Sequence, residues 1–367
     1  MHRLQFHYSL SRDARPALVR NVLIDLLQAV AKHGSISAAA RALDLSYRHV
    51  WGELKRWETE LGNELLVWEK GQSARLSEFG TKLLWAERQA QARLAPQIEA
   101  LRGDLERAFA VAFDDQAHVV TLYASHDDAL SALREHALMQ AHGQLHLDIR
   151  FSGSVDAIRA LNEGRCVMAG FHTLLDTGRR TLTERTYKPL LRPGRHKIIG
   201  FARRTQGLMV APGNPLRLAS LQDVAQRHAR FANRALGTGT RVVLDELLSR
   251  YGPPASDIDG YENTEPSHAA VAHAVAAGHR DAGLGIEAAA RAAGLDFVPL
   301  ADERYHLVCL KSALLQPGIA ALLALLQTPG WQRELASIAG HIAMQSGEVL
   351  SMRRVLPWWD FARRKRL

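Results

Sequence analysis

Apolar side chains recur at helical spacing in three successive segments near the start of this chain. The first covers Val22–Val30, the second Ile36–Leu43, and the third runs from Tyr47 to about Leu61. Ser35 and Ser46 stand where the second and third helices would each need an N-cap. The pattern therefore predicts three short helices connected by tight turns.

The third segment has one apolar side and one side that is cationic and aromatic. Val50, Leu54 and Trp57 would face the core. Two helices joined by a turn of three or four residues form a helix-turn-helix, whose second helix enters the major groove of DNA. A plain three-helix bundle with a solvated basic face is the alternative. The residues expected to contact DNA from this segment are Ser46, Tyr47, Arg48, Trp51 and Lys55.

Two short alternating segments follow, Leu65–Trp68 and Ala74–Leu76, separated by a turn of small and polar residues. A hairpin at this position has the form of a wing beside a helix-turn-helix. Lys70 and Arg75 are expected to reach the DNA backbone from it. The wing reduces the weight of the plain-bundle alternative.

A long helical pattern then extends from Phe79 to about Arg107. Pro96 lacks a backbone N–H group, so we expect an interruption near it. A helix of roughly 28 residues would span about 42 Å, which is enough to hold two DNA-reading heads apart.

From His118 onward, strand and helix patterns alternate, which favours an α/β architecture. The expected strands are Val119–Ala124, Leu145–Phe151, Cys166–Phe171, Lys197–Phe201, Arg230–Ala232, Asp281–Ile286 and Tyr305–Leu310. The expected helices are Asp127–Gln140, Val155–Asn162, Thr240–Arg250 and His268–Ala277.

Four of the strand-to-helix junctions share hydroxyl, glycine or arginine residues. In open α/β sheets, ligands gather beyond the carboxyl ends of the strands, where helix N-termini direct N–H groups outward. We therefore expect a small anion there, although Asp127 would repel it unless this carboxylate pairs with an arginine or caps its own helix. The candidate ligand-binding residues are Ser125, His126, Ser152, Gly153, Asn233, Arg234, Thr238, Gly239, Thr240, Arg241, Thr264 and His268.

Composition sets limits on the class of protein. The chain has 367 residues, of which 47% are hydrophobic and 23% charged, as expected of a soluble protein with two domains and a connector. The formal net charge is +8, but residues 1–115 hold 16 basic and 15 acidic side chains, so charge alone does not locate the DNA-binding end.

Cys166 and Cys309 offer neither a disulfide framework nor a thiolate metal site, and we expect two buried thiols. The sequence shows no secretion signal and no apolar run long enough for a membrane span, so a cytoplasmic location is expected.

Catalysis and metal binding are not expected. Ser125–Asp128 combine nucleophile, base and acid types, but adjacent residues point in different directions, and no Gly-x-Ser-x-Gly elbow surrounds Ser152 or Ser154. His268 and His273 lack a paired metal-ligand motif. We expect no enzyme activity, no metal and no cofactor.

Three stretches of the first region, 34–40, 45–51 and 74–80, resemble the DNA-binding domain of the molybdate-responsive ModE regulators and their LysR-type relatives. The resemblance covers roughly residues 20–85. It implies dimerisation through the helix after the wing.

The second region resembles the periplasmic-binding-protein-like (type 2) effector domain that follows a ModE-type head in some bacterial regulators. The stretches that carry this resemblance are 123–127, 153–158, 169–172, 231–234, 237–241, 264–268, 270–272, 281–285, 349–351 and 356–359. It implies two lobes, one from about 119–201 with the last helices and one from about 203–300, with the ligand between them. It also implies molybdate, tungstate or a small carboxylate such as formate as the ligand.

Together these observations predict an α-helical winged helix-turn-helix domain in residues 1–78 and a linker and dimerisation helix in 79–112. A two-lobed α/β effector domain in 113–350 and a basic tail in 351–367 complete the chain. The expected function is transcription regulation by a cytoplasmic homodimer or homotetramer that binds double-stranded promoter DNA and a small-anion effector, with no membrane contact. A small-oxyanion-binding protein, or an enzyme with an accessory helical domain, is the alternative.

Overall fold

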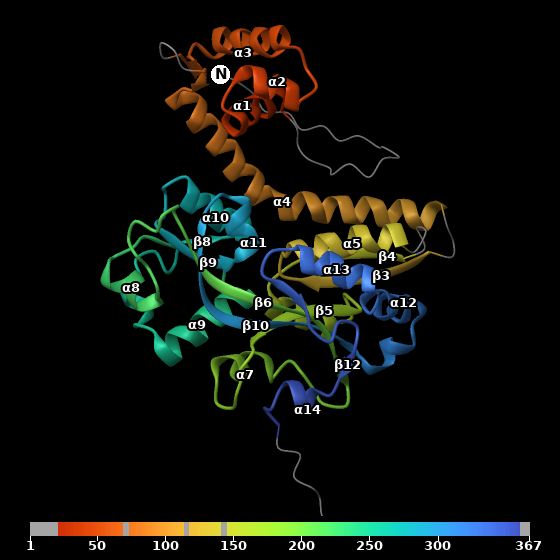
Figure 1. The fold of residues 1–367 in the computed structure, drawn as a ribbon. Helices are drawn as coiled ribbons and strands as arrows, with labels where there is room; N and C mark the ends of the chain where they lie inside the picture. Colours follow the sequence, from red (N-terminus) through yellow and green to blue (C-terminus); the bar gives the residue numbers. More distant parts are fainter. Residues whose placement is uncertain (1–20, 69–72, 114–116, 141–144, 360–367) are drawn as a thin grey trace, which may run out of the picture. The chain divides into compact units, whose positions relative to one another are not determined.

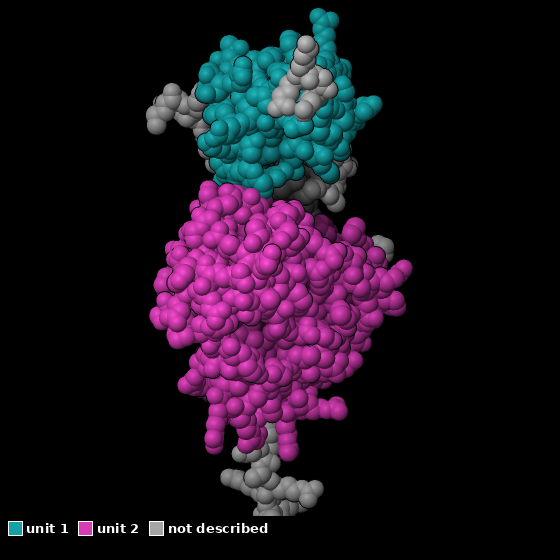
Figure 2. All heavy atoms as spheres, turned by 60° about the vertical axis from the view of Figure 1, so that its left-hand side comes forward, with its two compact units in different colours: residues 1–92 teal, residues 93–367 magenta. Residues whose placement is uncertain are grey.

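The computed structural model describes residues 21–68, 73–113, 117–140 and 145–359. Lys70 and the end of the basic tail, residues 360–367, lie outside the described residues. The chain forms two compact units, residues 1–92 and 93–367, which Figure 2 shows in different colours. No helix of the described residues is long and apolar enough to cross a membrane.

The first unit contains the three predicted helices and the predicted hairpin. Their bounds are α1 (Val22–His33), α2 (Ile36–Ala42), α3 (Tyr47–Leu61), β1 (Leu66–Val67) and β2 (Arg75–Leu76). The side chains of Ser35 and Ser46 cap α2 and α3 by accepting backbone N–H groups, as the sequence predicts. Leu27, Val50 and Leu54 are buried in one shared core, so α3 is fixed with its apolar side inward.

Helix α4 (Glu78–Phe113) begins in the first unit and continues into the second. The predicted interruption near Pro96 is wrong, because all 36 residues are helical. A proline removes one backbone hydrogen bond, and contacts on either side can hold the helix together across that gap. Arg93 and Glu99 supply such contacts by binding side chains of the second unit.

The second unit is built on a mixed sheet with the strand order β4-β3-β5-β10-β6-β9-β7-β8 (Figure 1). The strand bounds are β3 (His118–Ala124), β4 (Leu145–Phe151), β5 (Met168–Leu174), β6 (His196–Val210), β7 (Phe231–Arg234), β8 (Thr264–Glu265), β9 (Ala282–Ile286) and β10 (Asp296–Leu310). Two short strands, β11 (His341–Ala343) and β12 (Val349–Leu350), add to β6.

The two central strands divide this unit into two lobes. β6 and β10 are each 15 residues long and pair antiparallel along almost their full length. The first half of β6 and the second half of β10 join β5, β3 and β4 in lobe 1, whereas their other halves join β9, β7 and β8 in lobe 2. The two lobes expected from the sequence are therefore present, and β6 and β10 cross between them.

Helices cover both faces of each lobe. In lobe 1, α5 (Asp128–Gln140), α12 (Pro317–Leu326) and α13 (Pro329–Ser337) share one core. On the other face lie α6 (Ser154–Asn162), α7 (Leu182–Tyr187) and α14 (Met352–Val355), together with the buried Trp358. In lobe 2 the covering helices are α8 (Leu221–Gln226), α9 (Gly239–Tyr251), α10 (His268–Ala276) and α11 (Glu287–Ala292).

Candidate functional site

The exposed side of α3 is the first candidate site. Tyr47 and Trp51 expose 52% and 41% of their surfaces, and Arg48 is exposed beside them. Ser46 accepts the backbone N–H of His49 at 3.1 Å, which fixes the first turn of the helix. The side chains at the N-terminal end of α3 therefore face solvent, where a helix-turn-helix presents its base-reading residues.

Lys55 lies farther along the same helix and is partly engaged within the first unit. Its ammonium is 2.6 Å from Glu58 and lies 4.8 Å from the centre of the Trp68 ring. Glu58 also accepts the backbone N–H groups of Leu65 and Leu66, so this carboxylate ties α3 to the wing. Arg75 is exposed on β2.

The second candidate site lies between the two lobes. The backbone N–H of Val155, in lobe 1, donates to the carbonyl of Gly237, in lobe 2, at 3.2 Å. A Cβ atom on Gly153 would stand 2.8 Å from the same carbonyl oxygen, so a side chain there would force the lobes apart. Gly153 therefore permits the close approach of α6 to the start of α9.

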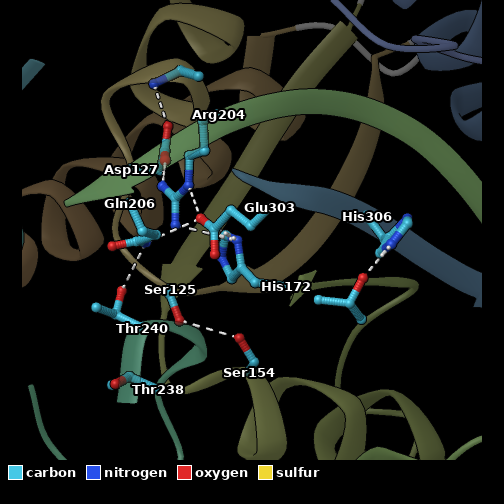
Figure 3. Close-up of polar contacts among 12 residues, drawn as sticks. Ser125, Asp127, Ser154, His172, Arg204, Gln206, Thr238, Thr240, Glu303 and His306 are labelled. Carbon is cyan, nitrogen blue, oxygen red and sulfur yellow. Dashed lines mark hydrogen bonds and ion pairs between the residues drawn. The ribbon is translucent and has the colours of Figure 1, made fainter. Parts of the chain in front are cut away.

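A buried cluster of charged groups lies around Arg204 of β6 and Glu303 of β10, the two strands that cross between the lobes (Figure 3). Arg204 of β6 binds Asp127, next to α5, and Glu303 of β10. It also lies 3.2 Å from Nδ1 of His172, while Gln206 donates to Glu303 at 3.0 Å. Asp127, expected to repel an anion unless paired or capping, does both, because its other oxygen accepts the N–H of Ala129.

The charges in this cluster shift the pKa values of its members. Burial raises the pKa of Glu303, but the charge of Arg204 together with the contacts of His172 and Gln206 outweighs burial and lowers that pKa to about 2. Burial likewise raises the pKa of Asp127, and Arg204, His341 and the N–H of Ala129 together bring it well below its usual range. Burial and the neighbouring Arg204 both lower the pKa of His172. The two carboxylates are therefore ionised and their shared counter-ion is Arg204.

Arg234 differs from Arg204 because it has no carboxylate partner in the described part of the chain. Only 2% of its surface is exposed, and Nη2 donates to the carbonyl of Pro266 at 2.9 Å. Its Nε and Nη1 atoms are buried and have no hydrogen-bond partner among the described residues. Burial first, and then repulsion from Arg204, lowers the pKa of this guanidinium to about 9. A cation left in this state favours an anion beside it.

Several predicted ligand residues lie near this region. Thr240 is buried, with Oγ1 3.3 Å from Nε2 of His268. The hydroxyl of Ser125 lies 3.3 Å from that of Ser154, and Figure 3 shows both of these serines and Thr240. The hydroxyl of Ser152 is buried and has no partner among the described residues. Serine and threonine hydroxyls can donate to an anion.

Other predicted ligand residues have structural duties that occupy their polar atoms. Asn233 donates to the carbonyl of Tyr261, and Thr238 caps α9. Arg241 binds Asp245 at 3.0 Å and lies over the Tyr261 ring at 4.0 Å.

The three remaining predicted ligand residues are placed by the sheet and by ring packing. Thr264 is exposed on the edge strand β8, and His126 packs on the ring of Phe151. Gly239 leaves room for the ring of His172, which a Cβ atom would approach to 2.2 Å.

The sequence reasoning did not include Arg204, Gln206, Glu303 or His172 among the site residues. The sequence did contain a signal for them, because charged and amide side chains stand close to predicted strands. Such groups are rarely buried without partners, so their presence in a strand indicates a polar site. Among the described residues, no group of three His, Cys, Asp or Glu side chains could hold a metal ion. Cys166 and Cys309 are buried free thiols, and burial raises the pKa of each to about 11.

Comparison with known protein families agrees with this geometry. Residues 135–327, more than half of the chain, match the PBP superfamily domain. The chain belongs to the PBP superfamily. Residues 23–81 match the bacterial regulatory helix-turn-helix proteins of the lysR family. A lysR-family head followed by a PBP superfamily domain is the architecture of LysR-type transcription regulators, which are not enzymes.

Individual relatives share parts of the chain. "Uncharacterized protein YvgK" of Bacillus subtilis is 30% identical over 201 residues, which are 55% of this chain and 64% of YvgK. The chain thus spans slightly less than two thirds of that relative. A Clostridium pasteurianum protein named for the 5′ region of a 2Fe-2S ferredoxin gene is 32% identical over 111 residues, 30% of this chain and 98% of that protein. A solved structure of a Corynebacterium glutamicum OxyR C206 mutant is 18% identical, covers 89% of this chain and 96% of its own, and has a TM-score of 0.43.

The part of α4 from Arg93 onward contacts both lobes of the second unit. Arg93 binds Glu265 of lobe 2 through two hydrogen bonds of 2.9 and 2.7 Å. Glu99 accepts a hydrogen bond of 2.8 Å from Ser131 of lobe 1, and Arg102 binds Glu135 there. Figure 1 shows this part of α4 running alongside α5. One helix is therefore attached to both lobes.

Proposed function

We propose that this chain is a cytoplasmic transcription regulator that binds promoter DNA through α3 and its wing, and binds a small anion between its lobes. The observation that carries the proposal is Arg234, a buried guanidinium with two unpaired nitrogen atoms and no carboxylate partner among the described residues. An anion that accepts hydrogen bonds from these nitrogens would remove the cost of burying the charge alone.

The proposed DNA contacts come from the N-terminal end of α3. Arg48 is suited to phosphate or guanine, while Tyr47 and Trp51 are suited to thymine methyl groups. Their exposure supports this role, because the same helix buries Val50 and Leu54. Arg75 on β2, with Lys70 between the strands, completes the proposed surface from the wing.

The proposed effector is a small oxyanion of the molybdate or tungstate type, or a small carboxylate such as formate. The resemblance to ModE-type regulators suggests these ligands. Arg234 would neutralise the charge, and Ser125, Ser152 and Thr240 would donate hydroxyl groups. Closing the lobes on the anion would strengthen these contacts, because water is excluded from them.

Transmission of the signal follows from the attachment of α4 to both lobes. Glu265, the partner of Arg93, directly precedes Pro266, whose carbonyl accepts the hydrogen bond from Arg234. A ligand that shifts lobe 2 relative to lobe 1 would therefore move the two anchor points of α4 differently. The ligand changes this equilibrium only by its difference in affinity for the two states.

Homodimer or homotetramer formation is part of the same proposal. Leu94, Leu101 and Phe109 are exposed large apolar side chains on α4, with Leu101 59% exposed. Their spacings of seven and eight residues place them on one stripe of the helix. A second copy of α4 would cover this stripe and set the distance between two DNA-reading heads.

The test combines DNA binding with a ligand screen on the full-length protein. Fluorescence anisotropy with the chain's own promoter region at low salt should give binding that Arg48→Ala weakens. A thermal-shift screen against molybdate, tungstate, sulfate, phosphate, nitrate and formate should give a concentration-dependent rise in melting temperature that Arg234→Met abolishes. Failure to bind the promoter, or the absence of any anion effect in the screen, would overturn the proposal.

A further inference from the structure

A continuous line of polar contacts runs from Glu303 to His268 at the interlobe site. Oε1 of Glu303 accepts from Nε2 of Gln206 at 3.0 Å, the same nitrogen lies 3.4 Å from Oγ1 of Thr240, and that oxygen lies 3.3 Å from Nε2 of His268. Arg234 lies near the end of this line, because its Nη2 atom donates to the carbonyl of Pro266, two residues before His268. Burial lowers the pKa of His268 well below its usual range, and the charge of Arg234 lowers it further. Figure 3 shows Glu303, Gln206 and Thr240 side by side.

Two hydrogen-bond acceptors along this line lack a donor. Oε2 of Glu303 and Oε1 of Gln206 are buried and have no hydrogen-bond partner among the described residues. Neither side chain exposes any measurable surface. An ionised carboxylate and an amide oxygen can only accept hydrogen bonds. The same region therefore presents unpaired acceptors as well as the unpaired donors of Arg234.

An anion without hydrogen atoms satisfies only one of these two sets. Its lone pairs would bind Arg234 but would face the carboxylate oxygen of Glu303, and a buried acceptor without a donor is unfavourable. An anion that keeps a hydrogen atom satisfies both sets. It accepts from the guanidinium and donates to Glu303 or Gln206.

We propose that the effector is a small anion that carries its own hydrogen-bond donor. Two groups of compounds share this chemistry: oxyanions that retain a proton at neutral pH, such as hydrogen phosphate, and short carboxylates with a hydroxyl group, such as glycolate or lactate. The inference rests on the proposed anion site and narrows the two proposed classes, oxyanions and small carboxylates, to members that carry a hydrogen-bond donor. It therefore disfavours molybdate, tungstate and formate, the examples that the resemblance suggests.

Matched ligand pairs test the inference on the unmodified protein. Phosphate and sulfate at pH 7 are both tetrahedral, but only phosphate retains hydrogen atoms; glycolate differs from acetate by one hydroxyl group. Isothermal titration calorimetry should show that phosphate binds at least about tenfold more tightly than sulfate, or glycolate at least about tenfold more tightly than acetate. Whichever pair discriminates identifies the group of compounds.

The outcomes separate this inference from the proposed function. If sulfate, molybdate or formate binds as tightly as the hydrogen-bearing anions, the donor requirement is overturned, whereas anion sensing stands. If none of the anions binds, both are overturned. Equal binding within each pair would likewise overturn the donor requirement, because the hydrogen atom of the ligand would then contribute nothing to affinity.

A variant locates the effect at the named residues. Gln206→Met removes one of the two acceptors and should reduce the preference for the hydrogen-bearing member of the discriminating pair by about threefold or more. Gln222→Met, an exposed position on α8, is the matched control and should leave the preference unchanged. Circular dichroism checks that both variants fold, and an undiminished preference in folded Gln206→Met would contradict the assignment.

Discussion

Replacing Arg234 by methionine tests whether this guanidinium is kept for a ligand rather than for stability. Methionine has a similar length and no charge. Burial, followed by repulsion from Arg204, lowers the pKa of Arg234 well below the ordinary arginine value, to about 9. Since each pKa unit corresponds to about 1.4 kcal/mol, the charged form costs the ligand-free fold about 5 kcal/mol.

Part of this gain is offset in the variant. The carbonyl of Pro266 loses the hydrogen bond from Nη2, and an unpaired buried acceptor costs about 1–3 kcal/mol. We therefore expect Arg234→Met to raise the free energy of unfolding of the ligand-free protein by about 2–4 kcal/mol at pH 7. The pKa of Arg234 is lower in the folded state than in the unfolded state. Burying its charge therefore lowers the free energy of unfolding by the full amount below pH 9. This effect is relieved as the pH rises above 9, so the advantage of the variant should shrink there.

Urea unfolding followed by near-ultraviolet circular dichroism measures this difference in the full-length protein. Arg227→Met, an exposed position in the same lobe, is the control and should change stability by less than about 0.5 kcal/mol. Saturating anion at 100 times its dissociation constant should stabilise the natural protein by about 2.7 kcal/mol and leave Arg234→Met unchanged. Destabilisation of the ligand-free protein by more than about 2 kcal/mol would refute the reasoning, because it would show that Arg234 already has a stabilising partner.

Three further predictions address the other parts of the molecule. Arg48→Ala should weaken promoter binding by about tenfold in gel-shift titrations and leave anion affinity unchanged. The control, Arg56→Ala on the same helix, should change DNA affinity by less than about threefold. Loss of anion binding in Arg48→Ala would contradict the separation of the two sites. Glu265→Gln, which weakens the ion pair between Arg93 of α4 and lobe 2, should preserve anion affinity but reduce the effect of the anion on DNA affinity. Glu262→Gln, at an exposed position, is the control. An unaltered anion effect in Glu265→Gln would rule out the Arg93–Glu265 contact as an anchor of α4. Because the pKa of Glu303 is lowered to about 2, its contribution to stability is complete above pH 4.5 and is lost as pH falls toward 2. Acid titration of the circular dichroism signal should show this loss. Constant stability across that range would exclude an ionised Glu303.

The local elements of the DNA-binding head could be predicted because short-range patterns determine them. The Ser46 cap, the inward Val50 and Leu54, and the hairpin all depend on residues within a few positions of one another. Core side chains recur at helical spacing, and each cap lies directly before its helix. The same reasoning identified most strands of the second unit, whereas its two lobes were expected only from the resemblance to periplasmic-binding-protein-like domains.

The central strands were predicted too short, and the reason is physical. The pattern for β6 ended at Phe201, and that for β10 began at Tyr305, whereas each strand is 15 residues long. The missing part of β6 contains Arg204 and Gln206, whose polar character argues against a buried strand. They are buried because Asp127 and Glu303 approach them from positions 77 and 97 to 99 residues away, and such partners cannot be identified from local sequence.

Long-range contacts also determine which predicted ligand residues keep free polar atoms. Arg234 and Arg241 are seven residues apart and equivalent as sequence candidates. Asp245 and Tyr261 engage Arg241, whereas Arg234 has only the carbonyl of Pro266 among the described residues. The difference depends on where lobe 2 places the carboxylates of Asp245 and Glu262, which lie beside Arg241.

The most direct measurement of the central claim is promoter affinity as a function of anion concentration, compared between the natural protein and Arg234→Met. If an anion at Arg234 controls DNA binding through α4, affinity should change with anion concentration in the natural protein and stay constant in the variant. The same anion dependence in both proteins would show that the signal does not originate at Arg234, and constant affinity in the natural protein would show that the cleft does not regulate DNA binding.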